Sequence, residues 1–240
     1  MEKMIADLSR SNHELERFAY GCCHDMNEPL RGMVSMAHLL VKHNEGALDE
    51  TSQEYLQHIV KGANRLQRLI QDILIYSKVG AKGITQESVS IQDVVKEIKD
   101  IYSAQILENK LVIEESFLSN CVWGNRVQII QVFQNLIENA IKFQSSETPK
   151  ISITSKVYDE HFWHYSIKDN GIGIEEEYFE DVFVVFKRLH GRQNYQGSGI
   201  GLSLCQKIIE AHGGKIWISA NSDAGSTIHF TLPSSPSASF

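Results

Sequence analysis

The first third of the chain carries apolar residues at alternating spacings of four and three, the pattern of helices packed in a bundle or coiled coil. One such stretch ends near residue 43, and a second begins after a polar connection at 43–52. Two long helices joined by a short turn form a hairpin that cannot bury both of its apolar faces alone. Two hairpins should therefore pair into a four-helix bundle, which predicts a homodimer. The seam residues are Leu15, Ala19, Cys22, Met26, Pro29, Met33, Met36 and Leu40, then Leu56, Ile59, Ala63, Leu66, Ile70, Ile73 and Ser77.

The pattern changes after a glycine-bearing linker at 81–88. Mixed elements follow, and their grouping predicts an α+β two-layer sandwich over 89–233, with a disordered tail at 234–240. Residues 1–80 form the helical domain, so the fold class is multidomain, with an all-α hairpin before an α+β domain. The expected helices lie near 91–108, 125–143 and 200–212, and the expected strands near 111–116, 151–158, 162–169, 215–220 and 226–232.

Composition narrows the function classes. The formal charge of -7 argues against a nucleic-acid partner, because such proteins usually present a basic face. No apolar run approaches the roughly 18 residues of a membrane span, and no signal peptide opens the chain. The four cysteines show no paired spacing, which favours a reduced, cytoplasmic protein, with tethering through an upstream segment left open. A sensory domain is expected upstream, since none lies within these residues.

His24 is the first candidate for chemistry. On a helix turning about 100° per residue, it falls roughly opposite the seam and should face solvent among polar neighbours. Asp25 follows directly, and its carboxylate is placed to accept a hydrogen bond from one ring nitrogen, which leaves the other as the better nucleophile. An exposed helical histidine alone is more often a solvated surface residue. Pro29 is expected to kink this helix, because it cannot donate to the carbonyl of Asp25.

Residues 131–143 contain polar side chains on one face of an expected helix. Asn135 and Asn139 lie one turn apart, a spacing that suits a Mg²⁺ ion which keeps several waters and bridges phosphates. Lys142 follows within reach of a phosphate oxygen. Asparagines without such a role are also common in helices, so this pattern is not specific by itself.

Two glycine clusters complete the candidate site. Asp169 ends an expected strand, where its carboxylate is suited to accept a hydrogen bond from the exocyclic amine of adenine, and Gly171 and Gly173 let the backbone turn close to a planar ligand. Residues 197–202 feed directly into a helix, whose N–H groups and dipole favour phosphates. The chain has neither a Rossmann fingerprint nor a P-loop. The glycine-cluster residues are Gly197, Ser198, Gly199, Ile200, Gly201 and Leu202.

The string His24-Asp25-Met26-Asn27-Glu28-Pro29-Leu30-Arg31 resembles the phosphoacceptor box of sensor histidine kinases, especially phytochrome-like ones. The ordered set of asparagines, Asp-x-Gly-x-Gly, Phe-x-x-Phe and Gly-x-Gly-x-Gly resembles the Bergerat or GHKL ATP-binding fold of histidine kinases, gyrase and the heat-shock chaperone ATPase. This second resemblance implies that Phe183 and Phe186 pack under a lid, with Lys187 or Arg188 near the phosphates.

The resemblance implies ATP-dependent phosphorylation of His24, with Mg²⁺ at Asn139, followed by transfer to an aspartate of a response-regulator receiver domain. Hydrolytic relatives carry a glutamate base where this chain has Asn135, so simple ATP hydrolysis lacks its base. Glu28 stands where a Thr or Asn places water in phosphatase-active members, which puts phosphatase activity in doubt. The alternatives are a degenerate, nucleotide-sensing scaffold and a stand-alone ATPase of the gyrase kind.

Overall fold

A computed structural model describes residues 26–44, 49–79, 85–117, 121–145, 148–189 and 198–235. The chain separates into two compact units, Met1–Lys78 and Val79–Phe240. This division agrees with the predicted change from a helical domain to a mixed domain. Within the described ranges, no helix combines the length and apolar character needed to cross a bilayer.

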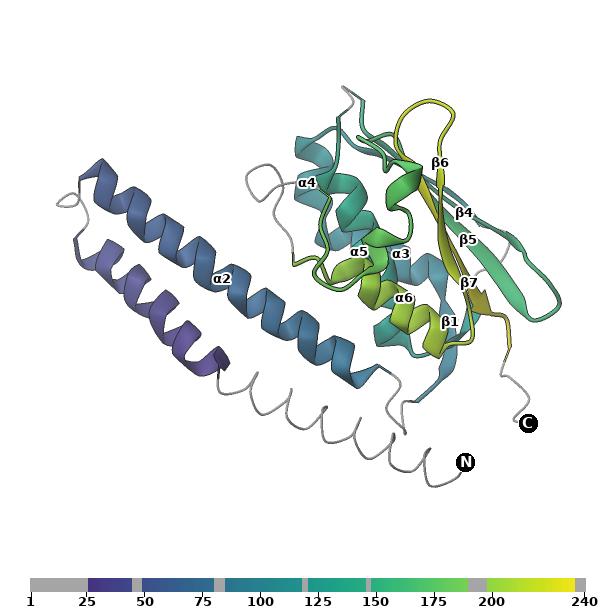
Figure 1. Ribbon diagram of the computed structural model, residues 1–240, viewed down its shortest axis with the longest axis horizontal. Coiled ribbons are helices and arrows are strands. Elements are labelled where there is room, and N and C mark those ends of the chain that lie inside the picture. The colour runs from purple at the N-terminus through teal and green to yellow at the C-terminus, as the bar shows by residue number, and fades with distance from the viewer. Residues whose placement is uncertain are drawn as a thin grey trace. The chain divides into compact units, whose positions relative to one another are not determined.

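The first unit contains two antiparallel helices, a helical segment over 26–43 and α2 (Glu50–Lys78) (Figure 1). Asp49 accepts a hydrogen bond from the amide of Ser52 at 2.9 Å, as a side chain does at the start of a helix. The contact between the two helices buries Leu30, Ala63 and Ile70, with Val34, Ile73 and Leu74 packed against them. This is the predicted helical hairpin.

The predicted seam of the first helix lies mostly outside the contact within the hairpin. Met33 is 57% exposed and Met36 is 64% exposed, and Met26 and Leu40 are exposed as well. The hairpin instead buries Leu30 and Ala37 on the adjacent side of the helix. Only part of the predicted seam of α2 is buried: Ala63 and Ile70 are buried, whereas Ile59 and Leu66 are exposed. Each helix therefore has an apolar face wider than one partner helix can cover.

The second unit is built on a five-stranded sheet with the order β2-β4-β5-β7-β6. The β2–β4 pair is parallel, and the other neighbouring pairs are antiparallel. A separate two-stranded ladder joins β1 to β3. The strands are β1 (Glu87–Ser90), β2 (Val112–Ser116), β3 (Cys121–Gly124), β4 (Lys150–Val157), β5 (Phe162–Asp169), β6 (Ile216–Ala220) and β7 (Ser226–Pro233).

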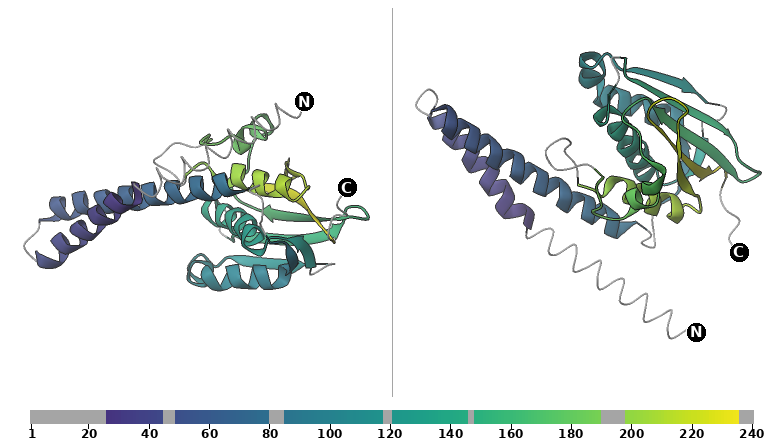
Figure 2. Two further views of the ribbon diagram at one scale, coloured as in Figure 1. Left: turned by 90° about the horizontal axis from the view of Figure 1, so that it is seen from below. Right: turned by 45° about the horizontal axis from the view of Figure 1, so that its top comes forward.

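Helices cover one face of this sheet, as the views in Figures 1 and 2 show. The ring of Phe133 on α5 meets the rings of Tyr165 on β5 and Phe230 on β7 edge-on, with centroids 5.8 and 5.3 Å away. All three side chains are fully buried, so this aromatic contact joins the two layers at the centre of the core. The helices are α3 (Ile91–Ile101), α4 (Ser103–Glu108), α5 (Arg126–Lys142) and α6 (Gly201–Ala211), with single 3₁₀ turns at Glu176–Tyr178 and Asp181–Phe183.

Two features differ from the sequence-based expectation. The helix expected over 91–108 is divided at Tyr102, whose φ of −96° and ψ of 12° depart from helical values. No residue of α4 is buried, so apolar contact with the sheet does not hold it in line with α3. Strands β1 and β3 were not predicted, because four residues are too few to establish an alternating pattern.

Candidate nucleotide site

Asp169 is the last residue of β5, and its side chain is partly buried. One carboxylate oxygen, Oδ1, accepts hydrogen bonds from the amides of Gly171 at 2.9 Å and Ser226 at 3.4 Å. Burial raises the pKa of this carboxyl group, while hydrogen bonds from the backbone amides of Gly171, Ser226 and Asp169 itself act in the opposite direction. No other described residue donates a hydrogen bond to Oδ2, so this oxygen is available to a ligand donor.

The turn after Asp169 requires glycine at two close approaches. A Cβ atom at Gly171 would overlap with the carbonyl oxygen of Phe143, the residue that follows α5. The same carbonyl accepts a hydrogen bond from the amide of Ile172 at 3.0 Å. Gly173 has a φ of +75°, which favours glycine. The turn is therefore held directly against the C-terminal end of α5.

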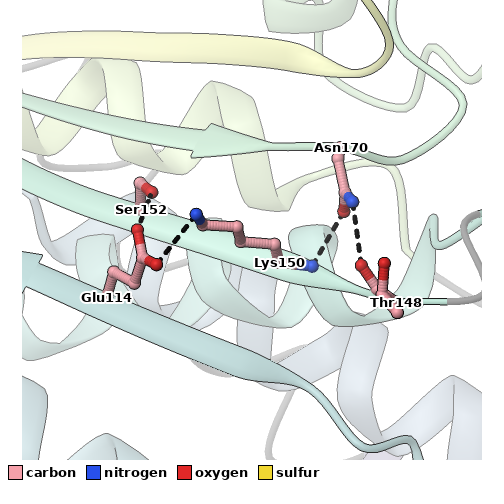
Figure 3. A network of polar contacts seen from close by, with 5 residues as sticks. All are labelled: Glu114, Thr148, Lys150, Ser152 and Asn170. Atoms are coloured by element: carbon pink, nitrogen blue, oxygen red, sulfur yellow. Dashed lines mark hydrogen bonds and ion pairs between the residues drawn. The ribbon is translucent and has the colours of Figure 1, made fainter.

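Asn170 fixes the same strand end from the β4 side (Figure 3). Its Oδ1 accepts from the amide of Lys150 at 2.8 Å, and its Nδ2 donates to the carbonyl of Thr148 at 2.9 Å. Lys150 also forms an ion pair with Glu114 on β2 at 2.8 Å, and Glu114 accepts a longer bond from Ser152. The network joins the middle of β2 and the start of β4 to the end of β5, next to Asp169.

The two asparagines of α5 have different surroundings. The side chain of Asn135 donates to the carbonyl of Gly201 at 3.3 Å and accepts from Gln131 at 2.9 Å. Asn135 thereby ties α5 to the first residue of α6. The side-chain amide of Asn139, one turn later and half-buried, has no hydrogen-bond partner among the described residues. Of the two, Asn139 is the one whose carboxamide oxygen is free to bind a metal ion.

Two cations lie near the C-terminal end of α5. Burial lowers the pKa of Lys142, and the positive charge of Arg188 lowers it further, while Glu138 acts in the opposite direction. The Lys142 ammonium also lies over the Phe143 ring, 4.4 Å from its centroid. An anionic group placed between Lys142 and Arg188 would relieve their repulsion. This fits a phosphate-bearing ligand.

The glycine cluster leads into α6, which begins at Gly201 without a side-chain cap. The amide of Ile200 bonds Ser198 Oγ at 3.2 Å, and Gly199 has a φ of +76°. The carbonyl of Gly199 accepts from the amide of Phe186 at 2.9 Å. An uncapped helix start beside Asn135 offers amide donors to an anion.

The expected lid lies mostly outside the described residues, so the packing of Phe183 and Phe186 beneath it stays a prediction. Phe183 is half-buried, but Phe186 is 58% exposed and has a φ of +67°, which is unusual for an aromatic residue. Lys187 forms an ion pair with Asp181 at 2.6 Å, whereas Arg188 lies beside Lys142 and Gly199. Of the two residues considered for the phosphates, Arg188 is the one on the side of α5.

The structure brings the predicted site residues of three segments together. Contacts between Asn135 and Gly201, and between Phe143 and Ile172, join α5 to the start of α6 and to the end of β5. Three further predicted residues, His24, Asp25 and Gly197, lie outside the described residues. The part of the chain that the structure describes holds no cluster of three His, Cys, Asp or Glu side chains suited to a metal, so a Mg²⁺ ion here would depend on amide oxygens and ligand phosphates.

Sequence reasoning missed the contribution of the β6–β7 turn. Ser226 is buried, and its Oγ has no hydrogen-bond partner among the described residues although its amide bonds Asp169. Asn221 donates to the carbonyl of Asp169 at 2.8 Å. The string Asn-Ser-Asp-Ala-Gly signals a turn, but nothing in it indicates contact with a residue about fifty positions earlier.

Comparisons with known proteins agree with both halves of this architecture. The family model of the His Kinase A (phospho-acceptor) domain matches residues 14–82, and that of the histidine kinase-, DNA gyrase B- and HSP90-like ATPases matches residues 124–236. This chain belongs to the histidine kinases. It carries the phosphoacceptor domain and the ATPase-type domain of that family, in the order that the sequence predicted.

Relatives of this histidine kinase core include two cyanobacterial photoreceptors. The chain is 39% identical to phytochrome-like protein Cph1 of Synechocystis over 97% of its length, and 38% identical to cyanobacterial phytochrome A of Nostoc over the same share. It spans 31% and 30% of these proteins. The core therefore corresponds to about a third of each relative.

Solved histidine kinases share the fold. The alignment with full-length ShkA, in complex with AMPPNP, covers 92% of this chain and 47% of the ShkA chain, with a TM-score of 0.72 and 21% identity. The alignment with ThkA, in complex with response regulator protein TrrA, covers 100% of this chain and 69% of the ThkA chain, with a TM-score of 0.65 and 25% identity.

Proposed function

We propose that this chain is the catalytic core of a sensor histidine kinase that phosphorylates His24 from ATP and passes the phosphoryl group to an aspartate of a response regulator. One observation carries the proposal. A phosphoacceptor domain and an ATPase-type domain occur in one chain, and in the second domain contacts join α5, which carries Asn139, to the start of α6 and to the turn after Asp169. The crystallised complex of ThkA with TrrA supports a response regulator as the partner.

The site residues divide the work of binding ATP. Oδ2 of Asp169 accepts from the exocyclic amine of adenine, and Oδ1 stays bonded to the amides of Gly171 and Ser226. Lys142 and Arg188 hold the phosphates from the α5 side, and the amides at 198–202 hold them from the start of α6. Gly171 and Gly173 keep the turn after β5 close to the base.

The carboxamide oxygen of Asn139 would hold a Mg²⁺ ion, which would supply positive charge against the phosphates. Asn135 supports this arrangement indirectly, because its carboxamide is engaged by Gly201 and Gln131. The absence of a carboxylate at this position disfavours activation of water, so the phosphoryl group goes to a histidine instead.

The neutral ring of His24 supplies the nucleophile. One ring nitrogen forms a bond to the γ-phosphorus as the bond between phosphorus and the β–γ bridging oxygen breaks, and ADP leaves. Asp25 accepts a hydrogen bond from the other ring nitrogen, fixes the tautomer and stabilises the positive charge that develops on the ring. The chemistry depends chiefly on positioning.

The apolar face left uncovered by the hairpin supports a homodimer. Met33, Met36 and Ile59 are exposed on the two helices of the hairpin, as are Met26, Leu40 and Leu66. Pairing two copies through these faces would form a four-helix bundle, consistent with the phosphoacceptor domain model that matches residues 14–82.

Incubation of the full chain with γ-labelled ATP and Mg²⁺ tests the kinase reaction. The label should appear on the protein in an acid-labile, base-stable form, as expected of phosphohistidine. The change His24→Gln should abolish labelling without weakening ATP binding, and His38→Gln on the same hairpin serves as the matched control. Labelled protein should then lose its label to an added receiver domain.

Each failure points to a different alternative. Bound ATP with no protein label would favour a nucleotide-sensing scaffold, and release of free phosphate without labelling would favour an ATPase. Labelling that survives His24→Gln would contradict the assignment of the acceptor.

A further inference from the structure

The turn between β6 and β7 holds an asparagine whose side chain is fully engaged. Nδ2 of Asn221 donates to the carbonyl of Asp169 at 2.8 Å and to the carbonyl of Ala224 at 2.9 Å. Its Oδ1 accepts from the hydroxyl of Thr227 at 2.6 Å. One side chain thus joins the end of β5 to both sides of a turn far away in the sequence.

The bond to Asp169 continues the sheet where its backbone pairing stops. The β5–β7 ladder ends at the pair Lys168–Thr227, whereas the β4–β5 ladder continues to Asp169 and Ile151. The carbonyl of Asp169 therefore lacks the next strand partner on the β7 side, and the amide of Asn221 takes that place.

The same turn supplies the contacts that orient the carboxylate of Asp169. The amide of Ser226 bonds Oδ1, and a Cβ atom at Gly225 would overlap with the carbonyl oxygen of Asp169. This close approach, at a φ of +82°, keeps the turn against the strand end. A shift of the turn would therefore move an amide donor of the carboxylate as well as the main chain.

We propose that Asn221 is a positioning residue for base recognition, which holds the β6–β7 turn against Asp169 so that Oδ2 meets the exocyclic amine of adenine. This inference rests on the proposed ATP-binding role of Asp169. Asn221 acts through Asp169 and does not itself contact the base. Asn170 holds the opposite edge of the same strand end, so the position of Asp169 is set from two sides.

The first test measures amide hydrogen exchange in the free chain. The change Asn221→Ala should speed exchange at the Ser226 amide about fivefold or more, because the turn loses its anchor to β5. The matched control is Asn109→Ala, which removes another side-chain donor to a carbonyl, that of Gln105 at the end of α4. The control should leave exchange at Ser226 unchanged.

The second test compares binding of ATP with binding of inosine triphosphate, which carries an oxygen in place of the exocyclic amine. We expect the preference for ATP to fall about fivefold in Asn221→Ala. Asn221→Asp should give a similar loss, because it keeps the acceptor for Thr227 but lacks both donors. Thr227→Val should have a smaller effect, since the bond to Asp169 remains. A purely structural role would lower stability without changing the preference between the two nucleotides.

Separate outcomes address the two proposals. If Asn221→Ala exchanges at Ser226 like the unaltered chain, or keeps its full preference for ATP, the positioning role is wrong while the nucleotide site stands. If the unaltered chain shows normal protection at Ser226 but binds neither nucleotide, the proposed function fails, and the positioning role fails with it.

Discussion

The two units of this chain differ in how they bury their large apolar side chains. The ATPase-type unit buries Phe133, Tyr165 and Phe230 completely within one chain, because helices cover one face of its sheet. The hairpin leaves Met33, Met36 and Ile59 exposed, because one partner helix covers only part of each helix surface. The ATPase-type unit encloses its core within one chain, whereas the proposed homodimer would cover apolar surface that the hairpin leaves exposed.

This difference matches the proposed roles. Binding a nucleotide requires side chains fixed within one domain, and the contacts around Asp169 are all intramolecular. If the proposed homodimer forms, it should add stability to the hairpin, and that stability should rise with chain concentration.

The largest expected effect comes from placing charge on the uncovered face of the hairpin. Met33→Glu combined with Met36→Glu should weaken dimerisation at least about 100-fold, because burying each methionine contributes roughly 1.5–3 kcal/mol. Analytical ultracentrifugation over a range of concentrations measures the change.

The control for this experiment lies in the other unit. Leu107→Glu combined with Val127→Glu alters two side chains that are 79% and 73% exposed, and it should leave the dimer intact. ATP binding should survive in both double variants. An unchanged dimer in the hairpin variant would contradict the bundle.

A smaller effect is expected within the ATPase-type unit. Asp169→Asn should lower ATP affinity by about tenfold or more, because a charge-assisted hydrogen bond to the base is lost. The free protein should not lose stability at neutral pH. Burial raises the pKa of this carboxyl group in the folded state, so its ionised form opposes folding once the pH has risen through that pKa. Calorimetric titration with ATP and thermal unfolding measure the two effects.

The raised pKa of Asp169 also sets the pH dependence of ATP binding. As the pH falls, Asp169 should take up a proton at a higher pH than an ordinary aspartate, and ATP affinity should decline there. Asp169→Asn should remove this decline. If ATP affinity still declines at low pH in Asp169→Asn, the decline belongs to another titratable group.

The last comparison concerns folding stability and changes one glycine in each unit. Gly171→Ala should destabilise the ATPase-type unit by about 1–3 kcal/mol, because the added carbon overlaps with the carbonyl of Phe143. Gly62→Ala on α2 meets no atom within 4 Å, and it should stabilise the hairpin by about 0.5–1 kcal/mol. Urea unfolding followed by tryptophan fluorescence reports the first change, since all three tryptophans lie beyond residue 80.

Far-UV circular dichroism reports the change in the hairpin. A loss of stability in Gly62→Ala would indicate that a partner helix approaches this position closely. A neutral result for Gly171→Ala would show that the turn after Asp169 can move away from α5.

Long elements with a clear period were predicted well. Helices α2 and α5, and strands β4 and β5, begin and end within a few residues of expectation, because their patterns extend over several turns or alternations. The four-residue strands β1 and β3 were missed for the opposite reason. The site residues on α5, at the end of β5 and before α6 were named from motifs, and contacts among these segments bring them together.

Local periodicity and short motifs were enough to establish the two-domain order, the hairpin, and the residue types suited to a phosphoacceptor and a nucleotide. The folded chain was needed to establish that Asn135 is engaged by Gly201 while the Asn139 side chain has no partner among the described residues, that Arg188 lies beside Lys142 while Lys187 pairs with Asp181, and that Asn221 anchors Asp169. Each of these outcomes depends on which groups from distant segments compete for the same hydrogen bond or charge, and a local pattern does not record that competition.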